Sequence, residues 1–387
     1  MSSPAARLSF AYFAYFSAIG VFTPFWSPYL ALRGFGAFEI GLLLAIAAGV
    51  RAIGPLAFGW LADASGRPTA ILRLAALSSL LSFALLPLLS GLTGFIVLTV
   101  LFCFGWNFIA PSLDAHTLAS LGATSARYGR IRSGGSLGFI ARAWGGGALF
   151  EQVGYELVPT LMLALIAATL IATMSLAATP LSGHAPAMRF RTAMRSRPVW
   201  VALLVAALIA LSFGPYYTFF SLYLERFGYS RGVIGFLWAL GVIAEIGIFA
   251  AGGSMLARFS IRALYVAAAG ATAVRWTLTA MFADSVFVLA FAQLLHSMGF
   301  AVLHFAIVLT AQRQFPPEAA ARGQALFSSV GYGVGGMLGS LLGGIVWSTI
   351  SPEAAYLYAA VVVVLALFCA WVGLRGTSLD RTDAQTA

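Results

Sequence analysis

Long apolar runs separated by short polar connections fill almost the whole chain. A run of about 20 apolar residues forms a helix long enough to cross the hydrocarbon core of a bilayer. The runs are continuous and do not alternate in roughly ten-residue units, so a transmembrane β-barrel is disfavoured. The pattern therefore predicts an all-α integral membrane protein with twelve transmembrane helices. These helices are expected at about residues 8–31, 38–62, 70–90, 93–118, 130–151, 157–178, 198–225, 231–257, 262–283, 285–312, 321–349 and 354–375.

The polar, basic segment at 179–198 is the largest break in this pattern and divides the predicted helices six and six. We therefore predict an N-terminal six-helix half at 1–178, a cytoplasmic central loop at 179–198, and a C-terminal half at 199–387 that ends in a short cytoplasmic tail. The apolar run from Leu8 is too long for a signal peptide and lacks a small-residue cleavage site, so it is expected to remain as the first helix.

The two halves carry an internal repeat. Shifting the chain by 194 positions aligns FTPFWSPYLALRGFGAFEIG (22–41) with YYTFFSLYLERFGYSRGVIG (216–235), with seven identical positions. The same shift superposes Arg51 on Glu245, so equivalent midplane positions hold opposite charges. Duplicated halves are typical of secondary transporters, whose substrate site is expected between the halves near the midplane.

Composition supports a membrane protein, because 61% of the residues are hydrophobic and 9% are charged, which excludes a set of soluble domains. All 22 basic residues are arginine. If both termini are cytoplasmic, sixteen arginines lie inside and three outside, as the positive-inside rule requires. The net charge of +10 is then a topology signal, and nucleic-acid binding is disfavoured. The predicted location is the bacterial inner membrane, with many passes and both termini in the cytoplasm.

Other functional classes find little support in the sequence. It contains no nucleophile with an adjacent base, no metal-ligand cluster and no phosphate-binding loop, so an enzyme is disfavoured and no cofactor or metal is expected. Cys103 and Cys369 both fall inside predicted helices, which argues against a disulfide framework. Without an ATP-binding motif, the driving force is expected to be an ion gradient. No obligatory protein partner is evident.

Ionisable residues inside predicted helices are few, and each is by default a functional candidate. Glu245 and Arg275 fall at similar depths on consecutive predicted helices, so we expect them to form an exchangeable pair whose rearrangement switches protonation; a permanent structural ion pair is the alternative. His296 and His304 are eight residues apart, on similar faces of one helix. They are proton-coupling candidates, with hydrogen-bonded packing as the alternative. No third metal ligand has a supporting spacing.

A second set of charges lies in the N-terminal half. Asp114 and Arg132 flank the connection between the fourth and fifth predicted helices, where a hairpin brings them together. Arg51 and Arg142 also fall at membrane depth. The alternatives are a cytoplasmic latch for Asp114, a topology role for Arg132 and a snorkelling or structural role for Arg142.

Together these charges favour an anionic substrate. Across the expected cavity region, four arginines (Arg51, Arg132, Arg142 and Arg275) face two carboxylates, Asp114 and Glu245, and an incoming carboxylate would complete their pairing. We take Arg51, Arg132 and Arg275 as candidate carboxylate ligands, and Phe25 and Tyr216 as candidates for stacking on an aromatic or sugar ring. Packing or membrane-interface roles are the alternative for the aromatic residues.

The connection GWLADASGRPTAIL (59–72) resembles the signature loop of the major facilitator superfamily. Asp63, Gly66 and Arg67 match the loop, and the resemblance implies that they form a conformational gate. The usual second basic residue is Pro68 here. An ordinary solvated turn is the alternative interpretation.

The assembled pattern resembles the phenylpropionate permease group of that superfamily, and more distantly lactose permease. The stretches that carry the resemblance are YFAYFSAIGVFTPFWSPYLALRG, IGLLLAIAAGVRAIG, GYSRGVIGFLWALGVIAEIGIFA, AVRW and LHSMGFAVLHFAIV. The likeness to lactose permease places Asp114 and Arg132 at its sugar-binding acid and arginine. It also places Glu245, Arg275 and His296 in its coupling network, whose proton-carrying glutamate corresponds here to Gly299.

We therefore predict a secondary transporter of the major facilitator fold that works by alternating access. It is expected to import a small aromatic carboxylate, such as 3-phenylpropionate, together with protons. A proton-coupled symporter of a sugar or nucleoside is the first alternative, and a drug or metabolite exporter is the second. A non-transporting sensor built on the same fold comes from a different class, but no appended soluble domain supports it. Sodium coupling is the alternative to proton coupling, and export is the alternative to import.

Overall fold

The computed structural model describes residues 4–121, 127–178, 194–256, 258–316 and 320–380, and these residues are helical apart from short turns. Within them, 10 helices are long and apolar enough to cross a membrane. Two further helices, of 26 and 21 residues, carry arginines and many small residues and complete the expected twelve segments. The predicted all-α membrane fold is confirmed. Most of the central loop lies outside the described residues.

The chain folds as two compact units, Met1–Gly183 with Ser221–Ala239, and His184–Phe220 with Leu240–Ala387. We call these the first and second units. Helices α1 to α6 belong to the first unit, α9 and α10 each divide between the units, and the remaining helices belong to the second. The elements are α1 Pro4–Leu32, α2 Ala37–Ser65, α3 Pro68–Ala84, η1 Leu86–Leu88, α4 Gly91–Leu121, α5 Tyr128–Val153, η3 Tyr155–Leu157, α6 Val158–Met174, α8 Arg197–Ser212, α9 Gly214–Arg226, α10 Arg231–Leu256, α11 Ile261–Met281, α12 Val286–Ser297, η4 Met298–Val302, α13 Leu303–Gln314, α14 Ala320–Ser328, η6 Ser329–Gly335, α15 Gly336–Thr349, α16 Pro352–Gly373 and η7 Ser378–Asp380.

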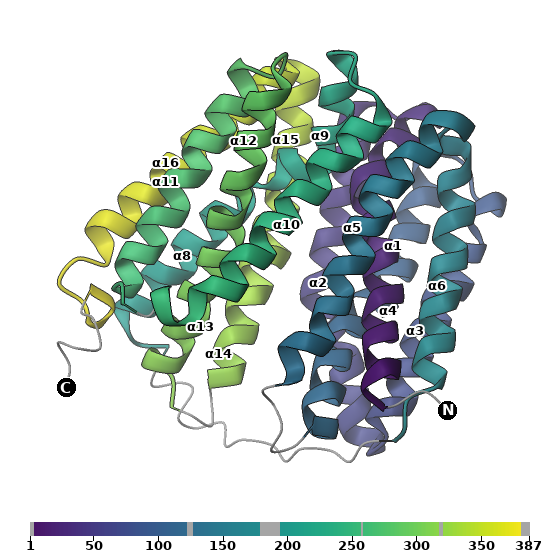
Figure 1. The fold of residues 1–387 in the computed structure, drawn as a ribbon, viewed down its shortest axis with the longest axis horizontal. Helices are drawn as coiled ribbons and strands as arrows, with labels where there is room; N and C mark the ends of the chain where they lie inside the picture. Colours follow the sequence, from purple (N-terminus) through teal and green to yellow (C-terminus); the bar gives the residue numbers. More distant parts are fainter. Residues whose placement is uncertain (1–3, 122–126, 179–193, 257, 317–319, 381–387) are drawn as a thin grey trace. The chain divides into compact units, whose positions relative to one another are not determined.

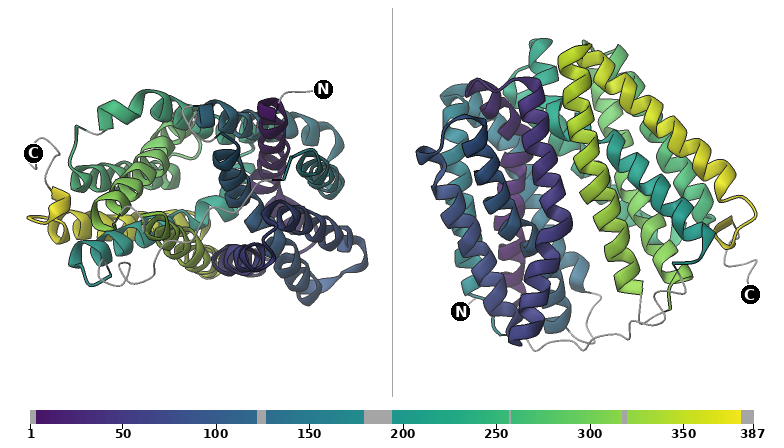
Figure 2. Two further views of the ribbon diagram at one scale, coloured as in Figure 1. Left: turned by 90° about the horizontal axis from the view of Figure 1, so that it is seen from below. Right: turned by 180° about the vertical axis from the view of Figure 1, so that it is seen from behind.

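Each unit is a bundle built around one extensively packed pair of helices. In the first unit α1 packs along α5 and α6, while α4 packs against α2 and α3 (Figure 1). In the second unit α11 packs along α16, and α16 in turn packs against α8 (Figure 2). Small residues allow the close contacts: a Cβ atom on Gly138 of α5 would collide with the carbonyl oxygen of Phe13 in α1.

The segment Ser221–Ala239 packs into the first unit through α5. A Cβ atom on Gly147 would collide with the carbonyl oxygen of Arg231, so the two backbones touch at a glycine. Polar contacts reinforce this approach: the backbone N–H of Arg231 donates to Glu151 Oε2 over 2.6 Å, and the Tyr155 hydroxyl donates to Glu225. The Arg231 guanidinium also lies 4.1 Å from the centroid of the Tyr155 ring.

The sequence repeat includes one backbone turn that both halves share. Gly34 ends the first helix of the repeat with φ of 87°, and Gly228, which is 194 positions later, has φ of 76°. Both glycines donate backbone hydrogen bonds of 3.0 Å three residues back, to Ala31 and Glu225 respectively. Glycine suits both sites because L side chains rarely adopt the left-handed region. The two halves therefore share a backbone turn as well as a residue pattern.

Three predicted helices are less regular than expected. The seventh is divided at Phe213, because Gly214 and Pro215 follow and proline cannot donate the N–H that continues the helical ladder. The tenth contains a π-helical segment, η4, and the eleventh contains another, η6. Glycines at 331, 333 and 335 are buried within η6, which packs closely against α8. Apolar length predicts such helices but does not reveal interruptions inside them.

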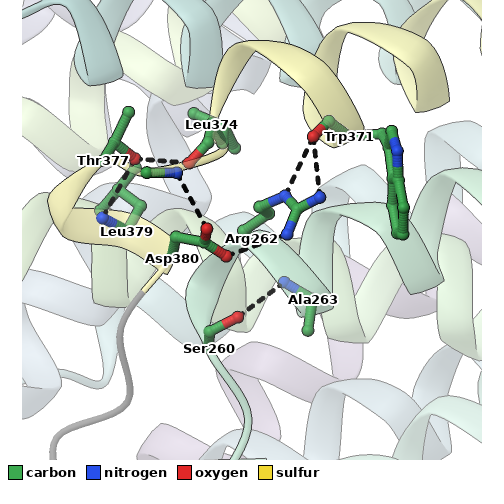
Figure 3. A network of polar contacts seen from close by, with 9 residues as sticks. Ser260, Arg262, Ala263, Trp371, Leu374, Thr377, Leu379 and Asp380 are labelled. Carbon is green, nitrogen blue, oxygen red and sulfur yellow. Dashed lines mark hydrogen bonds and ion pairs between the residues drawn. The ribbon is translucent and has the colours of Figure 1, made fainter. Parts of the chain in front are cut away.

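At the end of the chain, the residues after α16 fold back onto α11 (Figure 3). Arg262 donates to the carbonyl oxygen of Trp371 through Nε and Nη2, at 3.0 and 2.8 Å, and to Asp380 Oδ1 at 3.0 Å. Ser378 accepts a hydrogen bond from Gln314 of α13 over 2.7 Å. The short segment η7 thereby connects the ends of three helices of the second unit.

Candidate functional site

The second unit contains a buried arginine surrounded by aromatic rings. Arg275, on α11, is 0% exposed. Its guanidinium carbon lies 4.1 Å from the ring centroid of Tyr216, 4.2 Å from that of Trp276 and 5.3 Å from that of Phe213. Such cation–π contacts stabilise a charge without neutralising it. A positive charge is thus held inside an apolar, aromatic enclosure.

The hydrogen bonds of Arg275 leave two of its donors without a partner. Nη2 donates to Gln293 Oε1 over 3.3 Å, and the same oxygen accepts the Tyr216 hydroxyl over 3.1 Å. Among the described residues, Nε and Nη1 of Arg275 have no hydrogen-bond partner, and neither has Nε2 of Gln293. Buried donors of this kind are costly unless an acceptor reaches them. We call Arg275, Gln293, Tyr216, Phe213 and Trp276 the arginine cluster.

An acid–base pair lies beside the arginine cluster. His296, one turn after Gln293 on α12, faces Glu245 of α10 with 2.7 Å between Nε2 and Oε1. The side chains are 5% and 13% exposed, and His296 Nδ1 has no partner among the described residues. The His296 ring also lies 5.6 Å from the rings of Phe213 and Tyr216.

This pairing corrects the expected partner of Glu245. Glu245 pairs with His296, whereas Arg275 bonds to Gln293. The reason is that the sequence fixes the depth of a residue along its helix but not the face on which it lies. Arg275 faces α9 and α12, where Tyr216 and Gln293 lie, and His296 takes the place beside Glu245. Both charges remain in one neighbourhood, because His296 and Gln293 share a face of α12.

His304 and Gly299 also belong to the tenth predicted helix, but they lie outside the contact between His296 and Glu245. His304 lies on α13, half-buried, with its ring 6.1 Å from that of Phe249 on α10. Gly299 is buried in η4, where a Cβ atom would collide with Thr272 Oγ1 and lie 3.2 Å from Phe213 Cζ. No side chain, and certainly no glutamate, fits there without displacing its neighbours. A larger residue at this position would therefore have to displace Thr272 and Phe213.

The first unit brings Asp114 and Arg132 together, as the hairpin argument expects. Asp114 Oδ1 lies 3.7 Å from Arg132 Nε, and it also accepts the hydroxyls of Tyr12 over 2.7 Å and Tyr128 over 2.9 Å. The side chains of Arg132 and Asp114 are 31% and 37% exposed. Arg132 lies over the ring of Phe16 at 4.1 Å. We call Asp114, Arg132, Tyr12 and Tyr128 the aspartate cluster.

The remaining candidates lie outside the two clusters. Arg51, on α2, is exposed, and Arg142, on α5, is half-buried with Nε unpartnered among the described residues. Phe25 is 0% exposed, and its ring packs 4.9 Å from that of Phe150. The Phe25 ring also lies 6.3 Å from the ring of Tyr155 in η3, and these contacts favour the packing alternative for Phe25. Tyr216 is the predicted aromatic that does lie beside a charged candidate.

The predicted gate residues lie at the end of α2 and in the turn that leads to α3. Asp63 and Arg67 are exposed, and Gly66 has φ of 65° with its N–H directed to the carbonyl oxygen of Asp63 at 3.4 Å. Arg67 donates its backbone N–H to Ser65 Oγ over 3.3 Å. Glycine is required at 66 because the helix ends there in the left-handed conformation.

Sequence reasoning missed Gln293 and Tyr128, and it considered Tyr12 only as a stacking aromatic, not as a hydrogen-bond partner of Asp114. Gln293 has a recognisable signal, because it is a polar residue in an apolar run and precedes His296 by three positions, on the same helical face. The tyrosines have no such signal in a chain rich in aromatic residues. Among the described residues, no group of three or more histidine, cysteine or acidic side chains is placed to hold a metal ion.

Comparison with known proteins gives consistent matches over nearly the whole chain. The sequence profile of the MFS_1 like family matches residues 5–358. The chain is 28% identical over 333 residues to the "Probable 3-phenylpropionic acid transporter" of Escherichia coli (strain K12), which covers 84% of this chain and 86% of that protein. It is also 28% identical over 367 residues to the "Maltose permease" of Geobacillus stearothermophilus, with 92% and 90% covered.

Solved structures show the same fold at low sequence identity. The crystal structure of the nucleoside transporter NupG matches with a TM-score of 0.85 at 15% identity, covering 97% of this chain and 100% of that one. A bacterial homolog to the human lysosomal transporter Spinster matches with a TM-score of 0.78 at 16% identity, covering 98% of each chain. At these identities the structures show the architecture alone.

Proposed function

Because the chain belongs to the MFS_1 like family, within the major facilitator superfamily of transporters, we propose that it imports a small aromatic carboxylate together with protons. The relatives are transporters, so the chain is a multi-pass membrane transporter rather than an enzyme. The proposal places it in the bacterial inner membrane with both termini in the cytoplasm. Its two six-helix halves, joined by the central loop, would alternate access to the substrate, with Asp63, Gly66 and Arg67 contributing to the gate.

The observation that carries this proposal is the set of unpartnered donors in the arginine cluster. Nε and Nη1 of Arg275 and Nε2 of Gln293 are buried and can only donate. The group that satisfies them must therefore accept hydrogen bonds without bringing a donor of its own. A carboxylate meets this condition, because its two oxygens accept charge-assisted hydrogen bonds and bring no donor. A sugar hydroxyl brings a proton that would need an acceptor in the same place.

The surroundings of Arg275 favour an aromatic acid over an aliphatic one. Phe213, Tyr216 and Trp276 all face the guanidinium within 5.3 Å of their ring centroids. Aromatic rings in contact gain about 0.5–1.5 kcal/mol beyond the burial of their area. A ring attached to the bound carboxylate by a short chain would reach this enclosure.

We assign proton coupling to the pair formed by Glu245 and His296. The pair is buried and lies against the same rings as Arg275. A carboxylate and an imidazole in contact can share one proton, and a negative charge arriving beside them favours the protonated form of the pair. Binding of the anion and uptake of a proton would thereby support each other, so that the two enter together.

The test is uptake of labelled 3-phenylpropionate into right-side-out vesicles under an imposed inward proton gradient. Unlabelled aromatic acids, lactose and nucleosides serve as competitors, and 3-phenylpropanol serves as the neutral control of matched shape. Accumulation above equilibrium that only aromatic acids block is the expected result. Accumulation blocked by the alcohol as effectively as by the acid would contradict a carboxylate site.

A second candidate function rests on the aspartate cluster. Asp114 accepts two tyrosine hydroxyls beside Arg132, and both charged side chains are about one third exposed. Acceptors and donors in one place suit hydroxyl groups, as on a sugar or nucleoside. Displacement of labelled substrate by lactose or by nucleosides would favour a proton-coupled symporter of that class. Net efflux under the same gradient would instead indicate an exporter.

A further inference from the structure

Gln293 is a neutral side chain at a position where a charged one would compensate Arg275. It lies on α12, is 0% exposed, and bonds through Oε1 to Arg275 Nη2 and to the Tyr216 hydroxyl. The orientation of its amide follows from chemistry, because a guanidinium has donors only and must face the oxygen. The NH2 group of Gln293 consequently points away from Arg275 Nη2 as an additional donor.

Neighbouring helices restrict Gln293 to this arrangement. A Cβ atom on Gly241 of α10 would lie 3.3 Å from Gln293 Oε1 and 3.2 Å from His296 Cδ2. The backbone of α10 therefore approaches the polar face of α12 closely at Gly241. The hydrogen bonds to Arg275 and Tyr216 hold the Gln293 amide on this face. An amide fixed in this way holds the guanidinium in place and leaves its charge uncompensated.

We propose that Gln293 determines specificity for anions by holding Arg275 without neutralising it and by donating from Nε2 to the bound carboxylate. Glutamate has nearly the same shape, but it would pair with Arg275 and repel an incoming anion. The proposal rests on the proposed function, because it identifies how that site selects its substrate. Gln293 acts both through Arg275, as a positioning residue, and directly on the ligand.

The experiment compares Gln293→Glu with Gln293→Met for binding of 3-phenylpropionate by the purified full-length protein. Glutamate keeps the acceptor for Arg275 and Tyr216, whereas methionine keeps the volume and loses both acceptor and donor. A specificity role predicts a loss of affinity of about 100-fold or more for Gln293→Glu and about tenfold for Gln293→Met. A purely structural role predicts the reverse order, and that order would overturn the proposal.

Melting temperature without substrate supplies an independent measurement. Pairing with a carboxylate should stabilise a buried arginine, so the expected order of melting temperatures, from highest to lowest, is Gln293→Glu, wild type and Gln293→Met.

If wild type binds no aromatic acid, the proposed function fails, and the order of melting temperatures alone tests the relation between Gln293 and Arg275. If wild type and Gln293→Glu bind equally well, the function stands and the role of Gln293 is overturned. If Gln293→Glu does not fold, a Gln293→Met variant that loses all binding overturns the proposal, and one that retains about a tenth of the affinity supports it.

Discussion

Asp114 in the first unit and Arg275 in the second are both charged side chains within predicted membrane-spanning helices, yet the protein surrounds them differently. Asp114 has two tyrosine hydroxyls and Arg132 beside it, and more than a third of its side chain is exposed. Arg275 is wholly buried and donates through Nη2 to the Gln293 amide oxygen, while its Nε and Nη1 have no partner among the described residues.

The comparison teaches where a ligand would contribute most. A charge that the protein itself already solvates gains little from a new partner, because the new contact replaces an existing one. A buried charge that lacks acceptors gains the full strength of each hydrogen bond that a ligand brings. The arginine cluster is therefore the better candidate for substrate binding, although both clusters bring together residues that the sequence singled out.

Replacing Arg275 should have the largest effect on substrate binding. Arg275→Met is expected to weaken binding of 3-phenylpropionate about 100-fold or more, because two charge-assisted hydrogen bonds are worth about 3–6 kcal/mol. The variant should not melt below wild type, since an apolar side chain of similar length replaces a buried charge. Arg132→Met in the aspartate cluster is the matched control, with a change of less than about fivefold. Equal losses in both variants would remove the contrast between the clusters.

Replacing Glu245 in the acid–base pair should abolish proton coupling while substrate binding is retained. Glu245→Gln keeps a hydrogen-bond acceptor for His296 but cannot carry a proton, so exchange of labelled for unlabelled substrate should persist while accumulation against a gradient is lost. Counterflow and gradient-driven uptake in the same vesicles measure the two activities. Glu151→Gln, near the C-terminal end of α5, is the control, and this variant should accumulate substrate as wild type does. A Glu245→Gln variant that still concentrates substrate would show that the proton is carried elsewhere.

A glycine beside the arginine cluster tests how tightly that region is packed. Gly299→Ala places a methyl group against Thr272 and Phe213, which is expected to cost about 1–3 kcal/mol and lower the melting temperature by several degrees. Gly270→Ala on α11 is the control, because a Cβ atom there meets nothing within 4 Å. That variant should be unchanged or slightly more stable, since alanine favours a helix more than glycine does.

Removing the ion pair between Arg262 and Asp380 should give the smallest effect. The N–H of Gly376 and the Arg262 guanidinium hold the pKa of the Asp380 carboxyl below its usual range. Because the folded pKa is lowered, the contribution to stability is present above the unfolded pKa, near 3.9, and is lost as the pH falls through the folded value. Asp380→Asn should lower the melting temperature by about 1 °C at pH 7 and by less near pH 3. A difference that grows as the pH falls would reverse this sign.

The sequence predicts the helices well and the partners of side chains less well. Continuous apolar runs and short connections are sufficient for the twelve segments, and the repeated glycines at 34 and 228 even keep the same backbone conformation. The partner of Glu245 depends on which face of α10 meets α12, and helix length does not encode this. The close approach at Gly241 and the π-helical turn at η4 both affect that facing. Neither is visible as a change in apolar character.

The docking of Ser221–Ala239 onto α5 has a consequence for experiments that divide the chain. A co-expressed pair of fragments cut within the central loop would not consist of two self-contained folding units, because the second fragment carries a piece of the first unit. In that piece, the backbone N–H of Arg231 donates to Glu151, and Glu225 accepts the hydroxyl of Tyr155. Fragments cut within the central loop should therefore reassemble and copurify. A cut after Ala239 would leave Ser221–Ala239 on the first fragment, but it would interrupt α10. Fragment complementation is thus expected to succeed at the sequence boundary and fail at the structural one.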